Sequence, residues 1–304
     1  MKNDEYFFNY EMQPGIHLNK IEYENNNIKP LISIITSYYN ANEYMWQTMN
    51  CILNQTFPYW EWIIVDDGST KIEAIEYLEK IKKNDKRIKI FHKKNEGLAK
   101  GRDYAISKSS TDYILPLDAD DLIEPFYLEI LYKALNEYPD AAWSYTDLVG
   151  FGSQRYIWCK PFSAGRMTFN NTLVNAALFR KSDLEEVGCF PEKWKHYDED
   201  WALYLKLLRA GKHPVHVPII GFWYRRSNTG MQQTVRKNEN LRKQSDDYIA
   251  DIAKKVDIHI KGEEYEGKLP QEAVKTGFNS KERILAKILS NNLGVKIISS
   301  MYRH

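Results

Sequence analysis

The sequence has few cysteines and no long apolar run. Its three cysteines, Cys51, Cys159 and Cys189, are far apart and form no CxxC pair, which argues against structural zinc and is typical of a reducing compartment. No stretch is long and apolar enough to span a bilayer, and residues 1–29 lack the apolar segment of a secretory signal. We therefore expect a cytoplasmic protein.

Neither basic nor acidic residues are in large excess. The chain has 42 basic and 41 acidic residues, a net charge of +1, so no overall field attracts nucleic acid, and we expect no nucleic-acid partner. The 304 residues are 43% hydrophobic, which is enough to bury the core of one fairly large domain with appendages.

Short apolar runs alternate with helical patterns in the first half of the chain. The runs that predict strands are 31–36, 60–65, 88–92 and 113–117, and the helical patterns are 42–53, 72–82 and 98–107. Strands that alternate with helices predict an α/β fold with a mostly parallel sheet and helices on both faces.

The second half is less regular. It predicts a helix at 126–137, a strand at 141–146, an irregular aromatic segment at 147–169, a strand at 176–180, a helix at 200–210 and a last strand near 219–224. From about residue 238 the chain is charged and helical in pattern, with a basic amphipathic segment at 281–303. We expect a helical C-terminal extension there.

Polar side chains follow each predicted strand of the first half. They are Ser37 and Tyr39, then Asp66 and Asp67, then the turn 95–97 with Arg102, then Asp118 and Asp120. Each group alone is explained by a turn, a helix cap or a surface ion pair. In open α/β sheets, however, ligands bind beyond the carboxyl ends of the strands. Four groups at successive strand ends therefore predict a ligand site.

The acidic residues Asp118, Asp120 and Asp121 directly follow the strand at 113–117. Grouped carboxylates repel one another and are costly to remove from water, so they indicate a bound cation. The structural alternative is a solvated acidic turn before the next helix, with Asp121 as its cap.

These motifs together resemble the family 2 inverting glycosyltransferases of the GT-A fold. The segments that carry the resemblance are 31–40, 54–57, 62–69, 95–97 with Arg102, and 118–121. The resemblance covers about residues 30–226 and implies a GT-A (Rossmann-like) sheet flanked by helices. It implies transfer of a sugar from a nucleotide-diphosphate donor, most often a UDP-sugar, to an acceptor hydroxyl with inversion at the anomeric carbon.

The resemblance also implies roles at the donor site. The uracil contacts fall on Ser37 and Tyr39, the base or ribose contact on Asp67, the basic nucleotide-binding residue on Arg102, and the DxD motif on Asp118 and Asp120. Asp118 is then expected at the ribose or the metal, and Asp120 as the ligand of a Mn²⁺ or Mg²⁺ ion that bridges the diphosphate oxygens. A divalent cation there neutralises the charge that develops on the leaving UDP.

Inversion by direct displacement requires a base that takes the proton of the attacking hydroxyl. The resemblance places this base on Asp200, with Glu199 as the second candidate and Asp198 as the third. Acidic residues at a helix N-terminus also stabilise the helix itself, which is the structural alternative.

One motif departs from the family. Many members carry Tyr-Arg-x-His after the last strand, and this chain has Ser227 at the position of the histidine. A further protein ligand for the metal is therefore in doubt. Arg225 and Arg226 are candidates to contact the diphosphate instead, because guanidinium groups bind phosphate oxygens bidentately. The alternative is a solvated basic turn.

The acceptor is expected to be a glycan or a lipid-linked sugar in polysaccharide or glycoconjugate biosynthesis. Tyr156, Trp158, Phe162 and Phe169 form either a sugar-stacking platform or a satellite core. The segment 281–303 either packs on the domain or makes a peripheral contact with the inner face of the membrane. Both pairs of alternatives stay open.

Two other enzyme classes fit less well. A haloacid-dehalogenase phosphotransferase needs a residue between the two aspartates that are adjacent here, Asp66 and Asp67, and a sugar nucleotidyltransferase needs a Gly-rich loop after the first strand. A non-catalytic nucleotide-sugar or carbohydrate-binding relative stays the alternative. The predicted division is an N-terminal extension (1–29), a glycosyltransferase domain (30–230) with a nucleotide-binding half (30–121) and an acceptor half (122–230), and the C-terminal extension (231–304).

Overall fold

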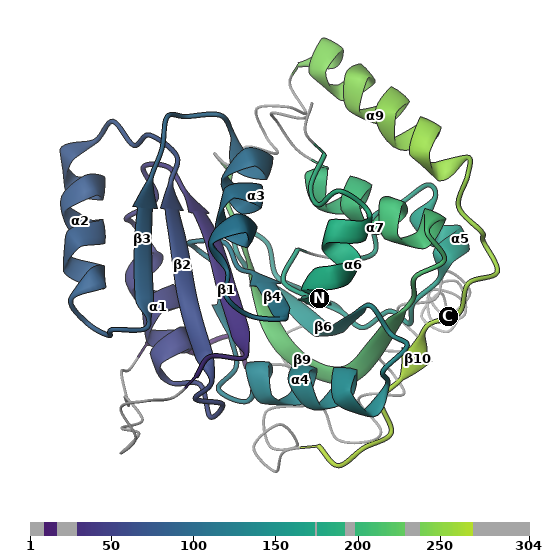
Figure 1. Ribbon diagram of the computed structural model, residues 1–304, viewed down its shortest axis with the longest axis horizontal. Helices are drawn as coiled ribbons and strands as arrows, with labels where there is room; N and C mark the ends of the chain where they lie inside the picture. Colours follow the sequence, from purple (N-terminus) through teal and green to yellow (C-terminus); the bar gives the residue numbers. More distant parts are fainter. Residues whose placement is uncertain (1–8, 17–28, 174, 192–197, 229–237, 270–304) are drawn as a thin grey trace, which may run out of the picture.

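One mixed sheet forms the centre of the computed structural model, which describes residues 9–16, 29–173, 175–191, 198–228 and 238–269 (Figure 1). Its strands are β1 (Ile32–Tyr38), β2 (Trp60–Asp66), β3 (Ile88–His92), β4 (Tyr113–Pro116), β5 (Leu122–Ile123), β6 (Trp143–Gly152), β7 (Tyr156–Trp158), β8 (Leu178–Arg180), β9 (Pro214–Arg226) and β10 (Glu263–Glu264). They lie in the order β10-β9-β6-β8-β4-β1-β2-β3, with β5 beside β9 and β7 beside β6. The pairs β4–β8, β8–β6, β5–β9 and β6–β7 are antiparallel, and the other pairs are parallel.

Helices cover both faces of the sheet. They are α1 (Met45–Leu53), α2 (Ile72–Lys82), α3 (Leu98–Lys108), α4 (Tyr127–Glu137), α5 (Ala164–Met167), α6 (Lys181–Glu186), α7 (Glu199–Arg209) and α9 (Glu239–Ala253). The buried residues of α1, α2 and α4 join one apolar core, and those of α3, α5, α6, α7 and α9 join a second core. Figure 1 shows α4 below the sheet and α3, α6 and α7 above it. The central strands β1, β2 and β4 are buried between these layers, which explains their nearly continuous apolar sequences.

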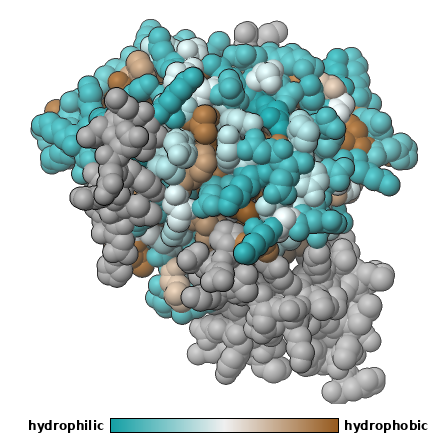
Figure 2. All heavy atoms as spheres, turned by 60° about the horizontal axis from the view of Figure 1, so that its bottom comes forward, coloured by the Kyte–Doolittle hydropathy of each residue, from teal (hydrophilic) through white to brown (hydrophobic). Residues whose placement is uncertain are grey.

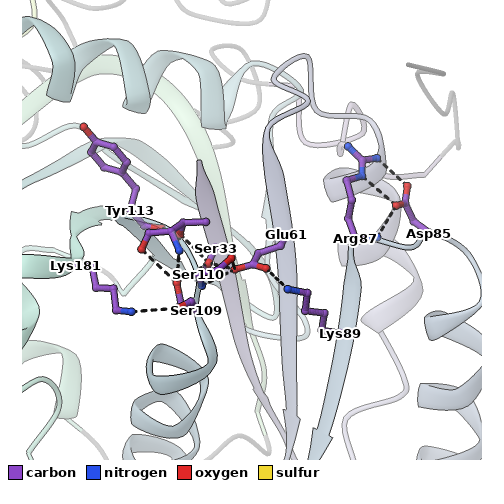
Figure 3. A network of polar contacts seen from close by, with 10 residues as sticks. Ser33, Glu61, Asp85, Arg87, Lys89, Ser109, Ser110, Tyr113 and Lys181 are labelled. Atoms are coloured by element: carbon purple, nitrogen blue, oxygen red, sulfur yellow. Dashed lines mark hydrogen bonds and ion pairs between the residues drawn. The ribbon is translucent and has the colours of Figure 1, made fainter. Parts of the chain in front are cut away.

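A buried carboxylate holds the amino ends of the central strands together (Figure 3). Glu61 of β2 accepts hydrogen bonds from Ser33 Oγ of β1 at 2.6 Å and from the backbone and side chain of Ser110, and it pairs with Lys89 at 2.5 Å. The segment before β4 is thereby tied to β1, β2 and β3. This network lies at the end of the sheet opposite the predicted ligand site.

The predicted elements of the first half are confirmed, two of them to the residue, at 72–82 and 88–92. The segment 147–169 differs from the prediction, because β6 continues to Gly152 and turns back as β7. A register shift at Asp147 interrupts the pairing with β9, and the pairing then continues to Arg226. The long strand β9 pairs with this extension of β6, and the local sequence gives no indication of that pairing.

The C-terminal extension is only partly helical. After α9 the chain returns to the sheet, where β10 pairs with β9. The basic segment 281–303, with its predicted membrane contact, lies outside the described residues. No helix in the described part of the chain has the length and apolar character needed to cross a membrane.

The surface carries few large apolar side chains. The face in Figure 2 is mostly hydrophilic, with apolar side chains in small separate patches. Among the described residues, Phe169 is the most exposed large apolar side chain, at 74%.

Candidate active site

The carboxyl ends of β1, β2 and β4 bring the predicted donor-site residues to one edge of the sheet. β1 pairs in parallel with both of its neighbours, so Tyr38 lies opposite Asp66, and the Leu117 N–H donates to the Ile35 carbonyl. Ser37, at the end of β1, is partly exposed and Tyr39, which follows it, is 49% exposed. Both side chains thus lie at the predicted edge.

Helix α3 approaches this edge closely because Gly101 lacks a side chain. A Cβ atom at position 101 would lie 2.2 Å from Ser37 Oγ, so any larger residue would push the helix away from β1. The glycine thereby allows Arg102, the next residue of α3, to lie close to the carboxyl ends of the strands.

Asp67 holds the N-terminus of α3. Its carboxylate accepts hydrogen bonds from the Glu96 N–H at 3.0 Å and the Gly97 N–H at 2.8 Å, and it pairs with Lys93 at 2.9 Å. The side chain is only 2% exposed. Asp67 therefore holds the turn that leads into α3, and its contact with a base or ribose stays a prediction.

Arg102 joins two acidic motifs that are far apart in the sequence. Its guanidinium contacts Asp118 Oδ1 at 2.7 Å and Glu199 Oε1 at 2.5 Å, and the residue is 1% exposed. Burial by itself lowers the pKa of Arg102, but the two carboxylates raise it above its ordinary value. The first aspartate of the DxD motif, Asp118, and the first acid of α7, Glu199, thus share one buried guanidinium group. A nucleotide contact of Arg102 stays a prediction.

Among the described residues, no cationic side chain forms an ion pair with the other two aspartates of the acidic motif, although the charge of Arg225 nearby acts to lower the pKa of both. Burial and the nearby Asp118 raise the pKa of Asp120 to about 6. Burial, Asp120 and Asp118 raise the pKa of Asp121 well above its ordinary value. Asp121 Oδ2 is buried and has no hydrogen-bond partner among the described residues. Asp121 does not cap the next helix, α4, because that helix has Phe126 as its N-cap residue. Its Oδ1 instead accepts the backbone N–H of Arg225 at 2.8 Å.

These carboxylates fit a divalent cation. Uncompensated buried carboxylate oxygens are hard ligands of the kind that Mg²⁺ and Mn²⁺ prefer. In the described ranges, no group of three or more His, Cys, Asp or Glu side chains is arranged to hold a metal ion. Such a cation would therefore rely on few protein ligands.

Arg225 is held beside the acidic motif. Its Nε donates to the Asp120 carbonyl at 2.7 Å and its Nη2 to Gln47 Oε1 at 2.7 Å, and the guanidinium lies over the rings of Tyr44 and Phe151. The neighbouring Arg226 lies over the Tyr224 ring, with 5.0 Å between its guanidinium carbon and the ring centroid. Arg225 is therefore fixed beside the acidic motif, whereas the diphosphate contacts of both arginines stay predictions.

Asp200 lies in the first turn of α7 and is partly exposed. Burial within the site and the adjacent Glu199 raise the pKa of Asp200 to about 7, against the opposing effect of Arg102. Asp200 Oδ1 accepts the Trp201 N–H at 2.7 Å, and Oδ2 lies 3.4 Å from Asn171 Nδ2. The group is thus a carboxylate that exchanges its proton near neutral pH.

The aromatic segment divides into buried and exposed parts. Phe162 packs edge-on against Trp143 in the second core, and Trp158 donates to the Thr172 carbonyl at 3.0 Å. Phe169 projects into solvent two residues before Asn171, the neighbour of Asp200. The satellite core explains Phe162, and Phe169 keeps its predicted role at the acceptor.

Sequence reasoning missed three residues of this site. Gln47 holds Arg225, Asn171 contacts Asp200, and Ser245 of α9 donates to Asp198 at 2.7 Å. Gln47 and Ser245 lie on helices whose sequences are otherwise ordinary, so no local signal marks them. The position of Asn171 in a long loop was the only indication available.

Known proteins are similar to this chain in sequence. The model of a family described as glycosyl transferase family 2 matches residues 33–193. An uncharacterized glycosyltransferase of Haemophilus influenzae is 28% identical over 252 residues, covering 76% of this chain and 77% of the relative. A putative teichuronic acid biosynthesis glycosyltransferase of Bacillus subtilis, TuaG, is 31% identical over 191 residues, covering 61% of this chain and 75% of the relative.

A solved structure is similar in fold. The crystal structure of S. aureus TarS 1-349 in complex with UDP-GlcNAc matches with a TM-score of 0.57 and 19% identity, covering 67% of this chain and 61% of that chain. At this identity the likeness concerns the fold alone. The chain spans less than two thirds of that TarS chain.

Proposed function

Because this chain belongs to glycosyl transferase family 2, we propose that it transfers a sugar from a UDP-sugar to an acceptor hydroxyl with inversion at the anomeric carbon. The chain is a glycosyltransferase with a GT-A-like fold. The UDP-GlcNAc complex of the TarS neighbour supports a UDP-sugar as the donor. The name of the TuaG relative supports polysaccharide or glycoconjugate assembly as the setting, with a glycan or lipid-linked acceptor.

The observation that carries this proposal is the bridge from Asp118 through Arg102 to Glu199. It joins the DxD motif, where the family binds the donor diphosphate, to the turn that carries Asp200. Displacement needs the donor and the base on opposite sides of one reacting carbon, and a buried arginine fixes two such groups in one geometry. The bridge therefore supports an active site assembled from both halves of the domain.

At the donor side, we assign Asp120 and Asp118 to hold Mn²⁺ or Mg²⁺. Asp120 has a raised pKa and no guanidinium partner for its carboxylate among the contacts described, whereas Asp118 already shares Arg102. When bound, a divalent cation neutralises the charge on the leaving diphosphate. Arg225, fixed at the Asp120 carbonyl, adds positive charge beside the same motif.

At the acceptor side, we assign Asp200 as the general base. Glu199 is less suited, because its carboxylate is buried and paired with Arg102. Asp200 is partly exposed and has a pKa of about 7, so near neutral pH it accepts the proton of the attacking hydroxyl. Asn171 lies beside its Oδ2 and orients it.

The experiment is a panel of nucleotide sugars incubated with Mn²⁺, in which release of the free nucleotide is measured before and after addition of EDTA. We expect hydrolysis of one UDP-sugar that stops when the metal is removed. Asp200→Asn should lower kcat by roughly 10²-fold to 10⁴-fold while UDP binding, measured by calorimetry, is unchanged. Asp112→Asn is the matched control, because Asp112 is exposed and directly precedes β4, at the end of that strand away from the site.

Two results would contradict the proposal. Unchanged turnover in Asp200→Asn would remove the base assignment. UDP binding without hydrolysis or transfer of any donor would instead establish the non-catalytic, nucleotide-sugar-binding alternative. The cytoplasmic location and the membrane contact stay predictions.

A further inference from the structure

Helix α9 contacts the turn that carries the proposed base. Figure 1 shows α9 on the outside of α7, and Ser245 near its middle donates a 2.7 Å hydrogen bond to Asp198 Oδ2. Ser245 is completely buried. Asp198 directly precedes Glu199 and Asp200, so a side chain from the C-terminal extension reaches the start of the catalytic helix.

The backbone at Asp198 is unusual for the start of a helix. A residue at this position normally has an extended conformation and accepts a hydrogen bond from the helix with its own side chain. Asp198 instead has φ 63° and ψ 15°, in the left-handed region, and its side chain caps nothing in α7. Its carbonyl accepts the Ala202 N–H at 2.9 Å. The first turn of α7 is therefore held by contacts from other elements, which include Arg102 at Glu199 and Ser245 at Asp198.

Helix α9 is anchored well enough to provide that hold. Ile249, Ile252 and Ala253 are buried in the same apolar core as Leu203 and Leu207 of α7. Burial of apolar side chains is the main source of such packing free energy. The Ser245 hydroxyl is thus presented to Asp198 from a fixed position.

We propose that Ser245 is a positioning residue of the active site, which holds the Asp198 turn so that Asp200 faces the acceptor. This inference rests on the proposed role of Asp200 as the base. Both partners of the contact lie beyond residues 33–193, the span that the family model matches. The C-terminal extension then contributes to the geometry of the active site, and removal of α9 should cause loss of turnover.

The test uses the full chain and the nucleotide sugar that the wild-type protein hydrolyses fastest in the panel above. Ser245→Ala is expected to lower kcat by roughly 10-fold to 100-fold, as small displacements of catalytic groups do, with the affinity for UDP unchanged. Gln244→Ala is the matched control, because Gln244 is the preceding residue of α9 and is exposed. It should behave as the wild type.

A double-mutant comparison separates positioning from general stability. Asp198→Asn keeps an acceptor oxygen and a residue that tolerates the left-handed region, so it should retain more of kcat than Asp198→Ala. Ser245→Ala combined with Asp198→Ala should lose no more than the worse single variant, because both changes break the same contact.

Hydrogen exchange gives a readout that does not depend on activity. In Ser245→Ala, exchange should rise at the Ala202 amide and its neighbours in the first turn of α7, and not at the distal end of the helix. Unchanged kcat and unchanged exchange would overturn the proposal, as would a uniform rise over α7 and α9. A wild-type protein that turns over no donor, but shows the local change in exchange, would contradict the proposed function while leaving the contact as described.

Discussion

Replacing Arg102 by methionine should destabilise the protein strongly. Methionine preserves much of the volume of the side chain but removes the charge that Asp118 and Glu199 share. Breaking a buried ion pair by removing one partner costs about 3–5 kcal/mol, because the remaining charge is left in a poorly solvated site. The side chain of Glu199 is 10% exposed and that of Asp118 is 31% exposed, so most of this cost should come from Glu199.

The measurement is the free energy of unfolding from denaturant titration at pH 7.5, together with the melting temperature. A loss of about 3–5 kcal/mol corresponds to a fall of roughly 6–20 °C in a domain of this size. Below neutral pH the deficit should shrink, since a buried Glu199 without its cation has a raised pKa and is stabilised by protonation in the folded state.

A second variant tests the cause. Adding Glu199→Gln to Arg102→Met should recover about 0.5–3 kcal/mol, because the uncompensated buried charge is then gone. Arg209→Met is the control, since Arg209 is exposed at the end of α7, and it should change stability by no more than about 0.5 kcal/mol. The reasoning is refuted if Arg102→Met costs less than about 1 kcal/mol or if the double variant shows no recovery.

Three further outcomes follow from other carboxylates. Because the pKa of Asp200 is about 7 and the base must be unprotonated, kcat should fall as pH drops below about 7, and a profile flat from pH 5 to 8 would exclude it as the base. Burial raises the pKa of Glu61, but Lys89 and the Ser33 hydroxyl lower it overall, so its stabilisation is present at neutral pH and lost as pH falls through the folded pKa. Glu61→Gln should therefore cost about 1.5–3 kcal/mol at pH 7 and less in acid, which denaturation at both pH values measures. Asp67→Ala should cost about 1–2 kcal/mol, because the N–H groups of Glu96 and Gly97 lose their carboxylate acceptor, and exchange at the Gly97 amide should become faster.

The repeating units of the first half could be predicted because their signals are local. The helix at 72–82 and the strand at 88–92 show the periodicity of their own element and are bounded by polar turns. The extension of β6 to Gly152 has a nearby partner, β7, but it also depends on β9, which lies more than sixty residues away. Pairing across such a separation leaves little trace in a short stretch of sequence.

The meeting of these polar residues at one edge of the sheet was predictable for a topological reason. Parallel strands end at the same edge, so polar residues after successive strands must meet there, and Ser37, Asp67 and Asp118 do lie at the predicted edge. Their partners were not predictable. The same spacing is compatible with Arg102 at a phosphate or between two carboxylates. The local sequence does not distinguish them, because the partner Glu199 lies 97 residues further along the chain.

The charges of the site also explain why the donor and the metal should bind together. Carboxylates outnumber guanidinium groups there, with Asp118, Asp120, Asp121, Glu199 and Asp200 facing Arg102 and Arg225. Together with burial, this excess of negative charge raises the pKa values of Asp120 and Asp200. Each of them therefore holds a proton more readily than a solvated aspartate. A diphosphate adds further negative charge, so we expect it to bind together with a cation. A cation alone would find few protein ligands among the described residues and would gain most of its oxygen ligands from the nucleotide. We therefore expect calorimetry to detect weak Mn²⁺ binding to the free protein and much tighter binding in the presence of UDP, and tight binding without nucleotide would contradict this account of the site.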